Sequence, residues 1–230
     1  MSKIKVELQA IFGTDRTISE AAWTSSTTLE GKEKKTDEQA NNLVINLAEE
    51  GHGVPFEHVI FRFWIRGPIQ LDRQIITYRM ASQSGMSGRY RTMPDDWLDI
   101  PEDVSAIYNK ITPLETEVLK KEYNDLCRKA NDYYRTELYA LKAAEQDGFI
   151  SNKDYKRARE FLRGVLPQNN MTERVITINL RSFANFLKQR LSEHAQPEIR
   201  HVAQEMLRLV KESNTCSTAI NWLEKNNWKI

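Results

Sequence analysis

Residues 73–90 read RQIITYRMASQSGMSGRY and contain three arginines, three serines and two glycines, directly after a run of apolar and aromatic residues. The end of this stretch, Ser87-Gly88-Arg89-Tyr90, offers a hydroxyl, unhindered backbone N–H groups and a planar guanidinium. Groups of these kinds converge where proteins bind phosphate. The stretch therefore predicts an anion-binding loop for a phosphate, and most of the chain can be understood as its support.

The segments before this stretch have clear periodicities. Residues 3–12 alternate apolar and polar side chains, as a half-buried strand does. Thr36 and Gln39 have the spacing of a capping box, which starts a helix. Phe61 and Phe63 lie in an aromatic β-type run. We therefore expect a strand over 3–12, a short helix over 17–28, a charged loop over 31–35, a helix from 36 to about 51, a strand-forming run over 52–69 and a helix over 70–78.

Helical patterns dominate after the stretch. Residues 112–144 carry apolar side chains at helical spacing, among them Val118, Leu126, Tyr133 and Leu138. Because neither repeats nor low-complexity linkers occur, we predict a single α+β domain over 1–230 with a central, mostly antiparallel sheet and a long helical layer. The other expected elements are a loop and short strand over 80–91, an irregular segment over 93–111, a helix from 151 to about 162, a strand over 174–178, and helices over 181–192 and 195–210.

Composition and charge exclude several classes of protein. The 33 basic and 32 acidic residues leave a net charge of +1, so no global field favours nucleic acid or a membrane surface. Cys127 and Cys216 lie far apart without a ligand-like spacing, which argues against a disulfide framework or a metal site and fits a reducing compartment. No run of about 18 apolar residues occurs, and the N-terminus lacks the apolar core of a signal peptide. We expect a soluble cytoplasmic protein, in the host cytoplasm if the source is viral.

Several polar groups could carry chemistry. Taken singly, each has an ordinary alternative, because an arginine or asparagine on a helix is more often a surface residue than a ligand contact. A nucleophilic role for Ser87 is disfavoured, since no histidine lies near it in sequence to act as a base. The candidates are His52, Glu57–His58, Gln74 to Tyr90, Arg163, and the set Asn179, Arg181, Asn185, Arg190 and His194.

The order of these motifs resembles one enzyme family. The patterns RQxxxxRxASxxxxSGRY over 73–90 and NxRSxxNFLxxRxxxHAQxEI over 179–199 are similar to the flavin-dependent thymidylate synthases. The segment PFEH over 55–58, with His52 before it, and the segment RGVLP over 163–167 also match in the right order. The resemblance implies the fold of that family, and it covers most of the chain.

The resemblance implies a site for deoxyuridine monophosphate (dUMP). The serine and arginines would hold the phosphate, because guanidinium groups bind it bidentately. Arg190 would face the pyrimidine ring as the catalytic residue and stabilise negative charge while carbon 5 becomes nucleophilic. The implied substrate-binding residues are Gln74, Ser87, Gly88, Arg89, Arg163 and Arg190.

The resemblance also implies FAD, NADPH and 5,10-methylenetetrahydrofolate as cofactors. A flavin hydride and the methylene group of the folate would together build the methyl group of thymidylate. The family is homotetrameric with shared active sites, so the same assembly is expected here, without a nucleic-acid or membrane partner. The implied cofactor-binding residues are His52, Glu57, Arg79, Asn179, Arg181, Asn185 and His194.

The signature of the family is altered at two places. Its arginine–histidine–arginine is Thr77-Tyr78-Arg79 here, and its asparagine–glutamate pair is Ser84-Gly85. These changes remove a cation and an imidazole on the flavin side and a carboxylate near the substrate. Two alternatives therefore stay open: a 5-hydroxymethylase acting on dUMP or dCMP, and a non-catalytic nucleotide-binding homologue.

Overall fold

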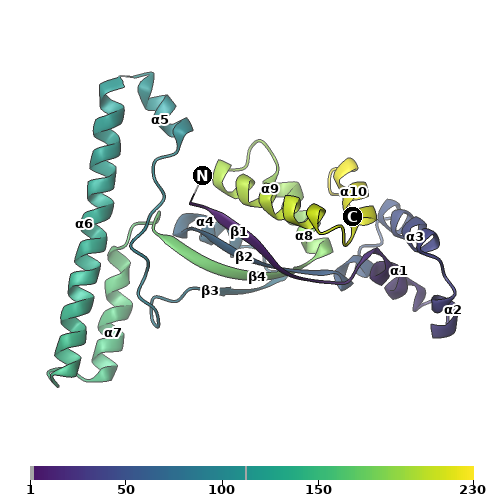
Figure 1. Cartoon of the computed structure of the whole chain (residues 1–230), viewed down its shortest axis with the longest axis horizontal. Coiled ribbons are helices and arrows are strands. Elements are labelled where there is room, and N and C mark those ends of the chain that lie inside the picture. Colours follow the sequence, from purple (N-terminus) through teal and green to yellow (C-terminus); the bar gives the residue numbers. More distant parts are fainter. Residues whose placement is uncertain (1–2, 112) are drawn as a thin grey trace. The chain divides into compact units, whose positions relative to one another are not determined.

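A four-stranded sheet with helices packed around it forms the fold in the computed structural model, which describes residues 3–111 and 113–230. Neighbouring strands run antiparallel in the order β1-β2-β4-β3 (Figure 1), so the predicted α+β class is confirmed. The strands are β1 (Lys5–Phe12), β2 (Ile60–Pro68), β3 (Ala81–Gly85) and β4 (Met171–Asn179).

The second strand begins later than expected. Residues Val54–His58 form a 3₁₀ helix, η1, and the strand starts only at Ile60. Pro55 explains the difference, because proline has no N–H for a strand ladder but is tolerated in the first turn of a helix. Phe56 is nevertheless buried. The aromatic run therefore contributes to the core from the 3₁₀ helix as well as from the strand.

Two helices occur in segments for which a loop or an irregular structure was expected. The charged segment 31–35 overlaps a short helix, α2, because the side chain of Thr28 accepts the N–H of Gly31 as a cap. The segment 93–111 contains α5, which begins just after Pro101 and has two acidic residues in its first turn. The predicted capping box at Thr36 is confirmed. Ser151, where the next helix was expected to begin, caps α7 and forms a capping box with Asp154. Thr112, the first residue of the predicted long helix, lies outside the described residues. The helices are α1 (Asp15–Trp23), α2 (Leu29–Glu33), α3 (Asp37–Glu49), α4 (Ile69–Ile75), α5 (Glu102–Asn109), α6 (Pro113–Gln146), α7 (Asn152–Leu162), α8 (Leu180–Arg190), α9 (Pro197–Glu212) and α10 (Ser217–Lys225).

Contacts between Cα atoms divide the chain into two compact units. Among the described residues, the first unit comprises Lys3, Arg66–Asp72 and Gly85–Glu173. The second unit comprises Ile4–Ile65, Arg73–Ser84 and Arg174–Ile230. The single domain over 1–230 stays a prediction.

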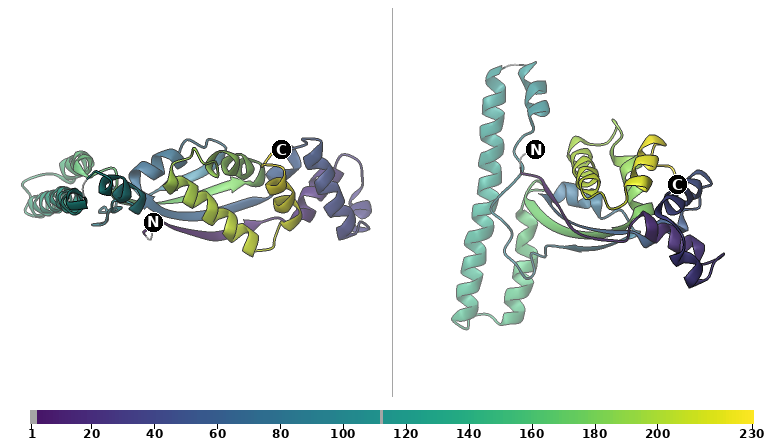
Figure 2. Two further views of the ribbon diagram at one scale, coloured as in Figure 1. Left: turned by 90° about the horizontal axis from the view of Figure 1, so that it is seen from above. Right: turned by 45° about the vertical axis from the view of Figure 1, so that its right-hand side comes forward.

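The first unit is built on α6 and α7, which lie side by side (Figures 1 and 2). Tyr134 and Leu138 of α6 are buried. The expected apolar stripe is wrong in part, because Val118, Leu126 and Tyr133 are exposed. The sequence pattern marks apolar positions, but it does not say which of them this unit covers.

The second unit has an aromatic core under α8. The ring centroid of Phe183 lies 5.2 Å from that of Phe61 and 5.7 Å from that of Phe63, and all three side chains are fully buried. Helices α8 and α9 cover this face of the sheet (Figure 2). This packing fixes the orientation of α8, which carries several of the candidate residues. Within the described ranges, no helix combines the length and apolar character needed to cross a membrane.

Candidate functional site

The predicted phosphate-binding residues of the first unit form a tight turn after β3. The N–H groups of Tyr90 and Arg91 donate to the carbonyl oxygen of Ser87 at 3.1 and 3.0 Å. The N–H of Arg89 donates to the Ser87 hydroxyl at 3.3 Å. The loop expected from the serines and glycines is therefore present.

Gly88 and Arg163 are brought together although they are far apart in sequence. A Cβ atom added at Gly88 would lie 3.1 Å from Cδ of Arg163 and 3.3 Å from Sδ of Met93. Glycine at position 88 therefore leaves room for the side chain of Arg163 to approach the backbone closely. Arg163 opens the short 3₁₀ helix η2 (Arg163–Val165), directly after α7.

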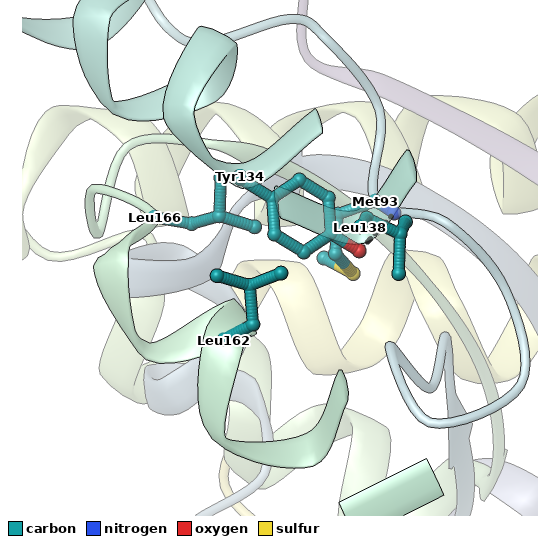
Figure 3. Close-up of a cluster of buried hydrophobic side chains, with 5 residues drawn as sticks. All are labelled: Met93, Tyr134, Leu138, Leu162 and Leu166. Atoms are coloured by element: carbon teal, nitrogen blue, oxygen red, sulfur yellow. Dashed lines mark hydrogen bonds between the residues drawn. The ribbon is translucent and has the colours of Figure 1, made fainter. Parts of the chain in front are cut away.

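A buried cluster holds this turn and the arginine in place. Leu162 and Leu166, on either side of η2, pack with Met93, Tyr134 and Leu138 (Figure 3). The N–H of Met93 also donates to the Tyr134 hydroxyl at 3.2 Å. Because closely packed cores resist displacement, the spacing between the turn and η2 is set by this cluster.

Two further charged residues of α7 contact the turn. Nε of Arg89 lies 2.6 Å from Oε1 of Glu160, and Nε of Arg159 donates to the carbonyl oxygen of Gly88 at 3.2 Å. Neither Arg159 nor Glu160 was among the residues predicted from the sequence. The sequence could have indicated them, because they precede Arg163 by four and three residues. Residues at this spacing lie on the same face of a helix. Three arginines against one carboxylate suit a phosphate dianion.

A cavity of about 700 Å³ lies in the second unit. Its walls come from η1, the segment 77–80, the end of β4, α8 and residues 228–230. Four of the predicted cofactor-binding residues line it, namely Glu57, Arg79, Arg181 and Asn185. Thr77 and Tyr78, which stand in place of the arginine and histidine of the signature, line it as well. The cavity is also lined by residues that were not predicted from the sequence, namely Lys188, Gln189, Trp228 and Lys229.

Arg181 is held at the cavity wall from two sides. Nη1 of Arg181 donates to Oε1 of Glu57 at 2.7 Å. A Cβ atom at Gly53 would lie only 2.7 Å from Nε of the same arginine, so glycine leaves room for the guanidinium. Asn179 has a different observed role, because its Oδ1 accepts the N–H of Ser182 and caps α8.

Arg190 ends α8 and contacts Tyr78. Its Nε donates to the Tyr78 hydroxyl at 2.7 Å, and that hydroxyl donates to Oε1 of Gln189 at 2.9 Å. Gln74, another predicted substrate residue, donates from Nε2 to Oε1 of Gln196 at 2.6 Å.

The two candidate histidines lie elsewhere in the second unit. His52 is exposed, and its Nε2 lies 3.0 Å from Oε2 of Glu50. His194 is exposed in the turn between α8 and α9. Neither imidazole is among the groups that line the cavity.

Comparison with known proteins shows one consistent likeness. A family model described as "Thymidylate synthase complementing protein" matches residues 7–213. The flavin-dependent thymidylate synthase of Kosmotoga olearia is 34% identical over 212 residues, covering 90% of this chain and 84% of the relative. That of Thermus thermophilus is 35% identical over 210 residues, covering 90% and 71%.

A solved structure shares the fold. The UMP/dUMP methylase PolB from Streptomyces cacaoi, bound with 5-Br dUMP, superposes with a TM-score of 0.74 over 96% of this chain and 95% of the other. Its sequence identity is 21%, so this likeness bears on the fold alone.

Proposed function

Because this chain belongs to the flavin-dependent thymidylate synthase family, we propose that it transfers the one-carbon unit of 5,10-methylenetetrahydrofolate to carbon 5 of dUMP. The product is dTMP, and FAD and NADPH supply the reducing electrons. The match of the family model over residues 7–213 carries this proposal. Nothing in the comparisons favours the hydroxymethylase or the non-catalytic homologue.

The cavity of the second unit fits a phosphate-bearing cofactor such as FAD. Arg79, Lys188 and Lys229 bring positive charge to its lining, while the carboxylate of Glu57 is paired with Arg181. The chemistry that bound FAD supplies is hydride transfer. Thr77 removes the arginine of the family signature, but the two lysines keep the lining cationic. These observations support binding of the cofactor despite the altered signature.

In this proposal, Ser87, Gly88, Arg89 and Arg163 bind the phosphate of dUMP. The support is the tight turn, the close approach of Gly88 to Arg163 and the surplus of guanidinium groups. The assigned cofactor contacts of His52, Asn179 and His194 rest on the family pattern.

Replacing Arg89 by alanine should weaken dUMP binding by at least about 1.5 kcal/mol, the lower end for a hydrogen bond to a charged group. Isothermal titration calorimetry measures the effect. The matched control is Arg208→Ala, which removes a similarly exposed arginine that pairs with Glu205 and Glu212 on α9. Unchanged affinity of the Arg89 variant would remove this residue from the site.

We further propose a homotetramer with shared active sites, in the cytoplasm. Val118, Leu126 and Tyr133 recur every seven or eight residues along α6, so they lie on one exposed face, as helix-pairing residues do. Exposed apolar groups of this kind mark interaction surfaces.

One set of measurements on the purified protein tests the function and the assembly. We expect light scattering to give four times the chain mass, and a yellow protein whose flavin spectrum is bleached by NADPH. Mass spectrometry should find dTMP after addition of dUMP and methylenetetrahydrofolate. A product heavier by one oxygen would support the hydroxymethylase instead. A monomeric mass would exclude the tetramer. Recovery of the protein in the membrane fraction of its cells would contradict the proposed cytoplasmic location.

A further inference from the structure

Tyr78 takes the signature position at which the family has histidine, and its surroundings are built around one contact. Its hydroxyl accepts a hydrogen bond from Nε of Arg190 at 2.7 Å. The guanidinium also lies over the phenol ring, 5.4 Å from its centroid. One side chain thus holds the arginine both by a charged hydrogen bond and by a cation–π contact.

The phenol is itself fixed in orientation. Its O–H donates to Oε1 of Gln189, whose Nε2 in turn donates to Oδ1 of Asn185 at 3.2 Å. The ring packs edge-on against Phe186, with centroids 4.9 Å apart and an interplanar angle of 73°. Burial raises the pKa of Tyr78 although Arg190 opposes the shift, so the hydroxyl keeps the proton that it donates to Gln189. A protonated phenol can accept from Arg190 and donate to Gln189 at the same time.

This contact leaves part of Arg190 available. A guanidinium has five N–H donors in a planar fork, and Tyr78 engages only the one on Nε. Within residues 3–111 and 113–230, no hydrogen bond or ion pair engages the two terminal nitrogens of Arg190. The terminal edge, which forms paired hydrogen bonds to planar oxygen groups, is therefore held in one plane and free for a ligand.

We propose that Tyr78 is a positioning residue for Arg190, and that it fixes the terminal edge of the guanidinium toward the pyrimidine of the substrate. The inference rests on the proposed role of Arg190 in the reaction. It gives the altered signature a function: the phenol at position 78 orients the arginine through its oxygen. Tyr78 itself does not touch the reacting atoms.

A double-mutant cycle tests this proposal. The variants are Tyr78→Phe, Arg190→Ala and their combination, and the assay is tritium release from [5-³H]dUMP, which detects slow turnover. Phenylalanine keeps the ring over the guanidinium but removes the oxygen. We expect kcat of Tyr78→Phe to fall about tenfold, as loss of a hydrogen bond to a charged group predicts. The KM for dUMP should change less than about twofold, because orientation acts on the transition state.

Testing Tyr78→Phe in the Arg190→Ala variant separates a positioning role of Tyr78 from other roles. With alanine at 190 there is no guanidinium to orient, so adding Tyr78→Phe should change the residual rate less than about twofold. Gln189→Leu provides a second variant, which removes the acceptor that fixes the phenol, and it should lower kcat in the same direction. Tyr139→Phe is the matched control, because Tyr139 is 79% exposed on α6 and should leave the kinetics unchanged.

The outcomes distinguish the two proposals. If Arg190→Ala leaves turnover unchanged, the proposed role of Arg190 fails. If Arg190→Ala lowers turnover but Tyr78→Phe does not, the positioning role of Tyr78 is overturned. The positioning role would also be overturned if Tyr78→Phe lowered kcat equally with arginine and with alanine at position 190. The same holds if Tyr78→Phe raised only the KM for dUMP. Equal thermal midpoints of the variants would show that these rates report on the site and not on unfolding.

Discussion

Replacing Arg190 by alanine is expected to lower kcat for dTMP formation about 100- to 1000-fold, the usual cost of removing a preorganised donor that stabilises developing negative charge. The guanidinium is held by the Tyr78 hydroxyl at 2.7 Å, and the aromatic core beneath α8 anchors the helix that carries it. In the proposed role, the guanidinium is therefore already oriented before the substrate binds. Its loss should appear in kcat more than in the affinity for dUMP.

Steady-state kinetics with dUMP, methylenetetrahydrofolate and NADPH measure this effect. Arg208→Ala again serves as the control, because it removes a guanidinium from α9 without touching the cavity. The flavin spectrum of both variants should match that of the unchanged protein, which shows that the cofactor site persists. A kcat within about threefold of the unchanged protein, well below the cost of losing such a donor, would refute the catalytic role.

Replacing Phe183 by alanine should lower the free energy of unfolding by about 3–5 kcal/mol, the range for truncating a buried phenylalanine. Phe183 is fully buried and packs on Phe61 and Phe63 of β2. The remaining cavity cannot close easily, since β2 and α8 both hold other buried side chains at this point. The cost therefore includes lost contacts as well as lost burial.

Denaturant unfolding at one fixed protein concentration gives this free energy, because the stability of an oligomer depends on concentration. The control is Phe12→Ala, at the end of β1, where the side chain is 66% exposed. We expect Phe12→Ala to lower the free energy of unfolding by less than about 1 kcal/mol, as substitutions at exposed positions do. If Phe183→Ala lowered the free energy of unfolding by no more than Phe12→Ala does, the aromatic cluster would not be important for anchoring α8.

Local patterns predicted the elements whose signals are local. The capping box at Thr36 involves residues three apart, and Ser151 directly precedes a helical pattern, so the sequence is sufficient to find both helix starts. The sequence pattern did not predict the helices that begin near Pro55 and just after Pro101. Proline is compatible with an irregular segment and with the first turn of a helix, so the residue alone does not decide between them. The pattern also failed along α6, where Leu126 is apolar but exposed, because burial depends on which elements cover the helix.

The candidate site shows the same division. The amino-acid sequence alone indicated the family and the loop that contains residues 87–90, since these depend on residue types in a fixed order. It also predicted four cofactor-binding residues that the structure places in the lining of the cavity. It did not reveal Lys188 and Lys229 in the lining.

Only the tertiary structure decided which side chains meet. Tyr78 and Arg190 are 112 positions apart and bond at 2.7 Å, and Gly88 leaves room for Arg163 from another part of the first unit. No spacing rule joins such pairs, because their distance is set by the packing of α8 on β2 and of α7 on α6. That packing gives Tyr78, which replaces the histidine of the family signature, a specific partner.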